Sequence, residues 1–125
     1  MKKYRSVEKN LENLILAWLH HKKIFAWKNQ SVGIWNAQKK CYFKSNNSFH
    51  IRGVSDILGI LPDGRLLAIE VKSAKGVLTD FQKDFLEKIK GRNGVAITAR
   101  SLRDVESALM AVASQCRTRP SVSDA

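Results

Sequence analysis

The sequence contains no stretch of the roughly 18 to 20 apolar residues that a membrane span requires. Its first residues lead into an amphipathic segment interrupted by charge, which is not the pattern of a signal peptide. Only two cysteines occur, Cys41 and Cys116. They lack the spacing of metal ligands, which excludes a zinc knuckle and argues against a disulfide scaffold. We therefore expect a soluble cytoplasmic protein with two free thiols and no membrane partner.

Acidic side chains are also scarce. The chain has 11 Asp and Glu residues against 22 Lys and Arg residues, for a formal net charge of +11. Residues 1–52 hold 11 of the basic side chains and only two acids, Glu8 and Glu12, so this half carries +9 of that charge. A polyanion that releases its condensed counterions on binding would relieve the self-repulsion, and nucleic acid is the expected partner. A generally basic solubilising surface, or a patch for an anionic membrane, is the alternative.

The 125 residues are 44% hydrophobic and 26% charged, a composition typical of one globular domain rather than of a disordered chain. We place this domain at residues 1–116. Residues 117–125, which include Pro120, are expected to form a frayed tail.

Hydrophobic spacing and turn residues predict an α/β fold. A helix is expected over residues 6–23 with Ser6 as its N-cap, followed by a short strand over residues 25–27. Residues 28–52 mix turn-forming and aromatic residues and favour a loop or an irregular hairpin. Strands are then expected at 54–61 and 65–72, on either side of a three-residue loop in which Gly64 can adopt a positive φ.

The rest of the chain alternates helix, strand and helix. A capping-box pattern at Thr79 and Gln82 opens a helix that runs to about Arg92, and residues 94–98 form a buried strand. Ser101 caps a last helix that ends near Cys116. The order αβββαβα predicts a mixed β-sheet flanked by helices. The apolar side of the middle helix is expected to consist of Phe81, Phe85, Leu86 and Ile89.

Two carboxylates and an ammonium group are predicted to meet where the two long strands end. Side chains alternate along a strand, so Glu70 and Lys72 share a face. If the loop has three residues, paired residue numbers sum to 126, and Asp56 lies opposite Glu70. Two carboxylates this close repel each other, and two hard oxygen ligands suit Mg²⁺. The alternative is an exposed hairpin that carries a cross-strand pair between Glu70 and Lys72.

A third carboxylate comes from the first helix. Glu8 falls inside the arc marked by Leu11, Ile15 and Leu19, whereas Glu12 falls just outside it. Glu8 is therefore a candidate metal ligand or acceptor for a metal-bound water. Favourable charge near a helix N-terminus is the other explanation for Glu8.

These residues resemble a known family. Ser55-Asp56, the Pro-Asp-Gly turn and Glu70-Val71-Lys72 look like the D...E-x-K core of the PD-(D/E)XK nucleases. Ser55 stands where that family usually has proline. The resemblance narrows to the VRR-NUC clade and runs from about Glu8 to Ile97. The further segments that carry it are Asn29 to Gly33, Gly53 to Asp56, Ile69 to Lys72, and Leu78 with Gln82.

The resemblance implies a restriction-endonuclease-like core and a metal-dependent phosphodiesterase. Carried over by position, Glu8, Asp56, Glu70 and the backbone carbonyl of Val71 would hold Mg²⁺ or Mn²⁺, and Lys72 would be catalytic. Gln82 would lie beside the active site, although a capping-box contact to Thr79 explains this residue equally well. No small-molecule cofactor is expected.

Several polar side chains are candidates for contact with DNA. Lysines and Arg52 are interleaved with Trp35, Tyr42 and Phe43, a combination of charge and stacking surfaces typical of nucleic-acid binding. The alternative is that the aromatic residues belong to the core and the lysines to a solvated edge. The three histidines are expected at the surface. The DNA-binding candidates are Lys28, Asn29, Lys39, Lys40, Lys44 and Arg52.

The sequence thus predicts a structure-selective DNA endonuclease that cuts branched DNA, such as four-way (Holliday) junctions, as a homodimer. A two-fold dimer offers two related active sites to a nearly two-fold junction. A non-catalytic basic nucleic-acid-binding module is the alternative from another functional class. A ribonuclease with the same fold is a third hypothesis.

Overall fold

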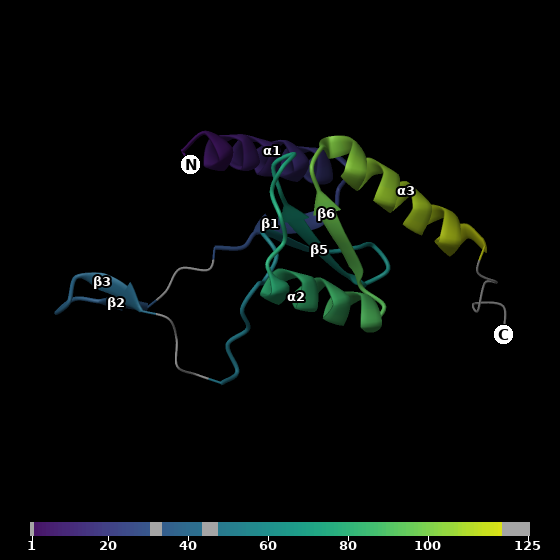
Figure 1. Ribbon diagram of the computed structural model, residues 1–125. Coiled ribbons are helices and arrows are strands. Elements are labelled where there is room, and N and C mark those ends of the chain that lie inside the picture. Colours follow the sequence, from purple (N-terminus) through teal and green to yellow (C-terminus); the bar gives the residue numbers. More distant parts are fainter. Residues whose placement is uncertain (1, 31–33, 44–47, 119–125) are drawn as a thin grey trace.

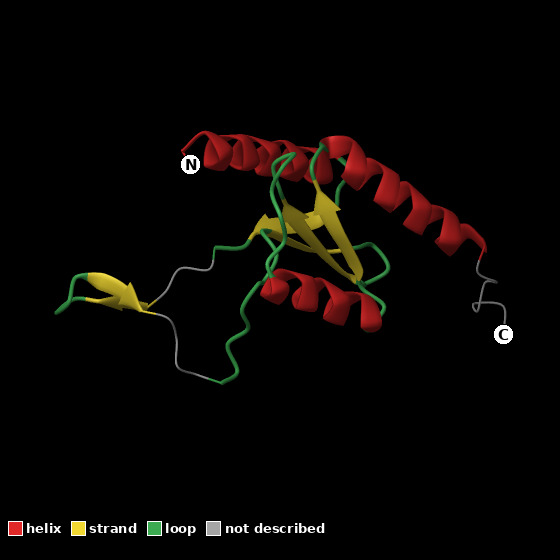
Figure 2. Cartoon of the chain, in the orientation of Figure 1, coloured by secondary structure: helices red, strands yellow, loops and turns green. Residues whose placement is uncertain are grey.

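The computed structural model describes residues 2–30, 34–43 and 48–118, which form three helices and six strands (Figures 1 and 2). Among these residues, no helix combines the length and the apolar character needed to span a membrane. The helices are α1 (Lys2–His21), α2 (Asp80–Gly91) and α3 (Leu102–Thr118). The strands are β1 (Phe25–Lys28), β2 (Ile34–Asn36), β3 (Cys41–Phe43), β4 (Ile57–Ile60), β5 (Leu66–Val71) and β6 (Val95–Ala99).

The main sheet has the strand order β1-β4-β5-β6, and a separate antiparallel hairpin pairs β2 with β3. In the main sheet β1, β4 and β5 are antiparallel, whereas β6 runs parallel to β5. Helices α1 and α3 cover one face and α2 covers the other (Figure 1). The predicted α/β fold, a mixed sheet flanked by helices, is confirmed.

Side-chain alternation in β5 divides the core into two layers. Leu67 and Ile69 pack beneath α1 and α3 with Ile15 of α1, whereas Ala68 packs against Phe85 of α2. The pairs between β4 and β5, such as Ile57 with Ile69, have the predicted sum of 126. Gly64 has the predicted positive φ, 92°, in the connecting loop. The register that places Asp56 level with Glu70 is therefore correct.

Several predicted boundaries differ from the structure. Helix α1 begins at Lys2, so Ser6 lies within the helix and is not its N-cap; no proline or glycine precedes Ser6 to stop the helix earlier. Strand β4 begins at Ile57 rather than at residue 54, and α3 continues to Thr118, two residues into the predicted tail. Residues 119–125 lie outside the described part.

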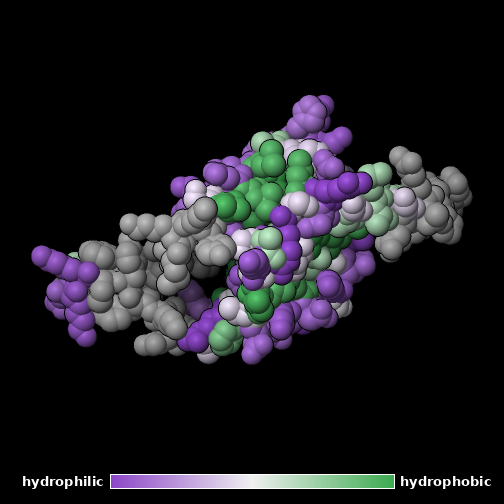
Figure 3. Space-filling model, turned by 45° about the horizontal axis from the view of Figure 1, so that its top comes forward, coloured by the Kyte–Doolittle hydropathy of each residue, from purple (hydrophilic) through white to green (hydrophobic). Residues whose placement is uncertain are grey.

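Helix α2 covers only part of its face of the sheet. It packs on β5 and β6, and apolar side chains on β1 and β4 stay exposed, among them Phe25 and Ile60. Phe81 of α2 is also exposed, which contradicts its predicted place in the core. On the side of the molecule drawn in Figure 3, apolar areas (green) likewise reach the surface between hydrophilic ones. The sheet is thus buried on all four strands beneath α1 and α3, and only in part beneath α2.

Candidate active site

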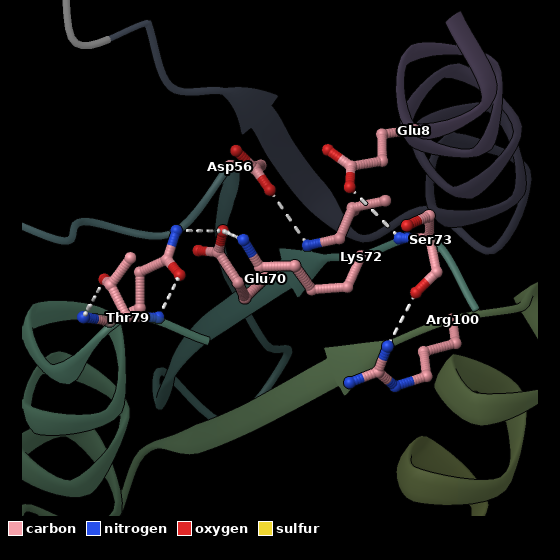
Figure 4. Close-up of polar contacts among 9 residues, drawn as sticks. Glu8, Asp56, Glu70, Lys72, Ser73, Thr79 and Arg100 are labelled. Atoms are coloured by element: carbon pink, nitrogen blue, oxygen red, sulfur yellow. Dashed lines mark hydrogen bonds and ion pairs between the residues drawn. The ribbon is translucent and has the colours of Figure 1, made fainter. Parts of the chain in front are cut away.

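The predicted carboxylates meet at the edge where β4 begins and β5 ends (Figure 4). The Asp56 carboxylate accepts a hydrogen bond from the Val71 N–H at 2.9 Å, which ties it to the end of β5. Glu70 is buried, with 2% of its surface exposed, and the Lys72 ammonium lies 3.9 Å from Glu70 Oε1. Asp56, Glu70 and Lys72 therefore share one site, as the strand register predicts.

Gln82 joins this site to the start of α2. Its amide oxygen accepts from the Thr79 N–H at 2.9 Å, and its backbone N–H donates to Thr79 Oγ1 at 3.2 Å, which completes the capping box. Its amide nitrogen donates to Glu70 Oε1 at 2.8 Å. The two explanations for this residue hold together, because one amide caps the helix and orients the buried carboxylate.

Helix α1 contributes two acids from the opposite side. Glu8 Oε1 accepts from the Ser73 N–H at 3.1 Å, just beyond Lys72. Glu12 was predicted to lie outside the core side of the helix, but this prediction is wrong, because it is buried and lies 3.9 Å from the Lys28 ammonium. The end of β1 lies next to α1, and Lys28 of β1 approaches Glu12 there. A helical wheel drawn from the apolar residues of α1 does not include this contact with another strand.

The proximity of these acidic side chains changes the pKa values of two of them. Burial, and next the negative charge of Asp56, raise the pKa of Glu70 to about 8. Burial and the Asp56 charge also raise the pKa of Glu12. Four carboxylates thus lie around the strand ends with the two lysines Lys28 and Lys72, and the site favours additional positive charge.

Two of these carboxylates fit a divalent cation. Glu70 Oε2 is buried and receives no hydrogen bond from an N–H or hydroxyl group of the described residues. A hydrogen bond to the Asp56 side chain helps to raise the pKa of Glu70, so the two carboxyl groups are close enough to share a proton or a cation. Mg²⁺ commonly uses one or two protein carboxylates and completes its coordination with water and substrate phosphate. Within residues 2–30, 34–43 and 48–118, no group of three His, Cys, Asp or Glu side chains is arranged as a metal site. The donor set therefore matches a two-carboxylate site rather than a closed protein cage.

A family model described as the VRR-NUC domain matches residues 3–102. The chain belongs to the VRR-NUC family. No curated protein and no solved structure matches it. The match confirms the resemblance seen in the sequence, and the mixed sheet with its flanking helices is the restriction-endonuclease-like core of these PD-(D/E)XK nucleases. The VRR-NUC chain therefore has a nuclease domain, which implies DNA as a substrate.

The DNA-binding candidates of this VRR-NUC chain fall into two places. Lys28 and Asn29 lie at the active site, where the Asn29 N–H donates to the backbone carbonyl of Asp56 at 2.8 Å. Lys39 and Lys40 are exposed between β2 and β3, on a hairpin that projects from the main sheet (Figure 1). Lys44 lies outside the described residues.

Arg52 lies beside the first turn of α2, which also carries Gln82, whereas the histidines lie away from the site. The Arg52 guanidinium lies 5.3 Å from the centre of the Phe81 ring. His20, His21 and His50 are exposed, as predicted, and a ring nitrogen of His20 lies 3.0 Å from the carbonyl oxygen of Ala26. No histidine therefore lies among the contacts described for the four carboxylates.

Sequence reasoning missed the residues that fix the segment after Lys72. The Lys72 N–H donates to the Ala99 carbonyl at 2.9 Å, and the Arg100 guanidinium donates to the Ser73 carbonyl at 2.6 Å (Figure 4). Glu8 holds the N–H of the same serine. The parallel pairing of β5 with β6 brings Arg100 to this edge of the sheet. The only sign of this role in the sequence is that Arg100 is a basic residue directly after β6.

Proposed function

We propose that the chain is a Mg²⁺- or Mn²⁺-dependent deoxyribonuclease that hydrolyses phosphodiester bonds as an endonuclease. The observation that carries this proposal is the adjacent pair of Asp56 and buried Glu70, whose proximity helps to raise the pKa of Glu70 to about 8. Two adjacent acids, one of them buried, are costly unless a proton or a cation lies between them, so a surface decoration is a poor explanation. This observation favours an enzyme over a non-catalytic binding module.

Each residue of the site has a distinct role in this proposal. Asp56, Glu70 and the Val71 carbonyl would hold the metal ion, which supplies charge for the scissile phosphate and acidity for a water molecule. The Val71 N–H and the Gln82 amide fix the orientation of the two carboxylates. Lys72 orients the attacking water or neutralises charge on the phosphate in the transition state.

Glu8 is a positioning residue in the described conformation. Its Oε1 accepts a hydrogen bond from the N–H of Ser73, the residue that follows Lys72. Glu12, the more buried of the two acids, holds Lys28 next to the strand ends. Of the two predicted roles of Glu8, the proposal keeps that of acceptor for a metal-bound water and not that of a direct metal ligand.

The proposed substrate is branched DNA, with four-way junctions preferred, and the proposed assembly is a homodimer. The charge distribution supports nucleic acid as the partner, because Glu8 and Glu12 are the only acids of residues 1–52 and both lie at the active site. The rest of that half is purely basic, so phosphate contacts dominate binding and sequence is not read.

Site-directed variants test the catalytic proposal. Purified protein is incubated with junction and linear DNA, with and without Mg²⁺, alongside Asp56→Asn and Lys72→Met. Each substitution should lower the cleavage rate by about 100-fold or more, since it removes a ligand or a transition-state charge. The matched controls are Asp84→Asn and Lys88→Met, an exposed ion pair of α2 with a separation of 2.9 Å, which should leave the rate unchanged.

The outcomes separate the three hypotheses. Cleavage that persists in both site variants would reject this site. Binding without cleavage under every metal condition would favour the basic binding module. Faster cleavage of the RNA version of the same substrate would favour a ribonuclease, because the 2′-hydroxyl then increases the rate. Calorimetric titration of Mn²⁺ into wild-type protein and Asp56→Asn tests metal binding without DNA, and equal heats in both would contradict the ligand assignment.

A further inference from the structure

An exposed aromatic ring lies at the start of α2 where the sequence predicts a core residue. Phe81 and Phe85 are four residues apart and share a helix face, yet Phe85 is 9% exposed and Phe81 is 53% exposed. Phe85 packs on Ala68 and Leu86, whereas Phe81 is one turn closer to the strand ends. The core therefore does not account for the ring of Phe81.

The ring carries a cation on one side. The guanidinium carbon of Arg52 lies 5.3 Å from the ring centre, within the range of a cation–π interaction. Arg52 is itself exposed, so the pair forms a stacked surface open to solvent. A planar cation over an aromatic ring offers both a stacking face and a donor for phosphate oxygens.

This pair lies beside the active site. Gly53, directly after Arg52, has a φ of 77°, and a Cβ atom there would lie 2.3 Å from the Phe81 carbonyl carbon and 2.6 Å from the Gln82 nitrogen. The chain after Arg52 is thus pressed against the first turn of α2. Gln82, the neighbour of Phe81, donates to Glu70 at 2.8 Å. Phe81, which stacks with Arg52, is therefore followed directly by Gln82, which contacts the buried carboxyl group of Glu70.

We propose that Arg52 and Phe81 bind an unpaired nucleobase of the nucleic-acid substrate, next to the phosphate that is cut. The inference rests on the proposed nuclease function. It adds that the site selects substrates with an unpaired base next to the phosphate that is cut. Every base has a face that can stack on Phe81 or on the guanidinium, whatever the sequence. In a continuous duplex that face is already stacked on its neighbours, whereas bases at a branch point or in a single strand can be splayed out.

The position of the pair favours a base over other occupants. A protein segment bound to Phe81 would lie next to Gln82 and obstruct the approach of DNA to Glu70, which contradicts a nuclease site at the same place. The basic balance of residues 1–52, of which Arg52 is the last, also matches a polyanion better than an apolar partner.

Binding to metal-free protein tests this inference without cleavage. The DNA carries a single 2-aminopurine, placed either unpaired at a branch or within a continuous duplex. Phe81→Leu should weaken binding to the branched DNA by about 10-fold, the loss of one stacked base, and should change duplex binding less than twofold. Phe81→Tyr should keep the wild-type affinity because it keeps the ring, and Arg52→Lys should give an intermediate loss.

The matched control is Phe25→Leu. Phe25 is 68% exposed and pairs with Ile60, which ends β4, whereas Asp56 directly precedes the start of β4. Phe25→Leu should therefore leave the affinity for both DNAs unchanged. Equal losses on both DNAs for Phe81→Leu, an unchanged affinity, or an unchanged 2-aminopurine signal would overturn the inference. If Phe81→Leu cleaves DNA at the wild-type rate and with the wild-type preference for branches, the base-binding inference is overturned and the nuclease proposal stands. If wild-type protein binds branched DNA selectively but never cleaves it, only the nuclease proposal is overturned.

Discussion

Glu70 makes the stability of the metal-free protein depend on pH. Its folded-state pKa of about 8 lies above the ordinary value of 4.5, because burial and Asp56 disfavour the charged form. Between these values the folded chain keeps a proton that the unfolded chain has released, so the free energy of unfolding falls as pH rises. In urea denaturation with a chelator present, we expect wild-type protein to lose stability from about pH 5 to about pH 8.

Glu70→Gln is the control for this pH dependence. An amide does not titrate, so the variant should lose much less stability over the same range, and the remainder reflects Glu12, whose pKa is also raised. Adding Mg²⁺ at the upper end of the range should stabilise wild-type protein and not the variant. Identical slopes for both proteins would show that Glu70 does not hold its proton.

Ser55 is a second buried polar residue, and its hydroxyl lacks a hydrogen bond to the described residues. It has no exposed surface. Replacing a buried hydroxyl that lacks a partner removes its desolvation cost, so Ser55→Ala should stabilise the fold by about 1 kcal/mol. Ser101→Ala is the contrast: its hydroxyl accepts from the Asp104 N–H at 3.3 Å at the start of α3, and its loss should cost about 1 kcal/mol. Destabilisation by Ser55→Ala in urea denaturation would mean that the hydroxyl has a partner.

Single residues were predictable where a periodic rule applied. The alternation of a strand and a three-residue loop are enough to bring Asp56 level with Glu70. Glu12 and Phe81 were missed because their burial depends on what lies opposite them, namely the end of β1 and the limit of the sheet. A helical wheel contains neither piece of information.

At the level of elements, α2 is aligned with the active site by close contact of its first turn with Gly53. Gly53→Ala would add a Cβ atom 2.3 Å from the Phe81 carbonyl carbon at a φ of 77°. Gly64→Ala has a comparable φ of 92° but open space around the new atom. We expect Gly64→Ala to cost about 1 to 2 kcal/mol from backbone strain alone, and Gly53→Ala to cost clearly more.

The two variants should also differ in activity. Moving the first turn of α2 displaces Gln82 from Glu70, so Gly53→Ala should lower the cleavage rate even at temperatures where it is folded. Gly64→Ala, in the loop at the far end of β4 and β5, should not. Thermal unfolding followed by circular dichroism, together with cleavage assays, checks both statements. Equal costs for the two variants would show that the chain around Gly53 relaxes away from α2.

Elements were predictable from local signals, and their limits less so. The capping box at Thr79 and Gln82 gave the start of α2, and Ser101 gave that of α3. The start of α1 was placed at Ser6, although nothing in residues 2–5 opposes a helix. The sequence does not decide between a loop and a hairpin for β2 and β3, because strands of three residues are too short to show an alternating pattern.

For the molecule as a whole, the surface leaves room for a partner copy. A groove between α1 and α3 is lined mainly by apolar side chains, including Trp18, Leu109 and Met110. One domain of 125 residues has a single site with the pair Asp56 and Glu70, whereas a four-way junction has two related strands to cut. A two-fold dimer supplies a second copy of the same site.

We therefore expect a homodimer in light scattering or sedimentation at micromolar concentration. If it forms, a four-way junction should be cut by nearly symmetric nicks in two opposing strands, and the rate should exceed that for linear duplex of the same sequence. Mixing wild-type protein with an excess of Lys72→Met sharpens the test, since mixed dimers have one competent site and should nick one strand without the opposing cut. A monomer that cuts both substrates at equal rates would remove the basis for paired cleavage and leave a nuclease without preference for branches.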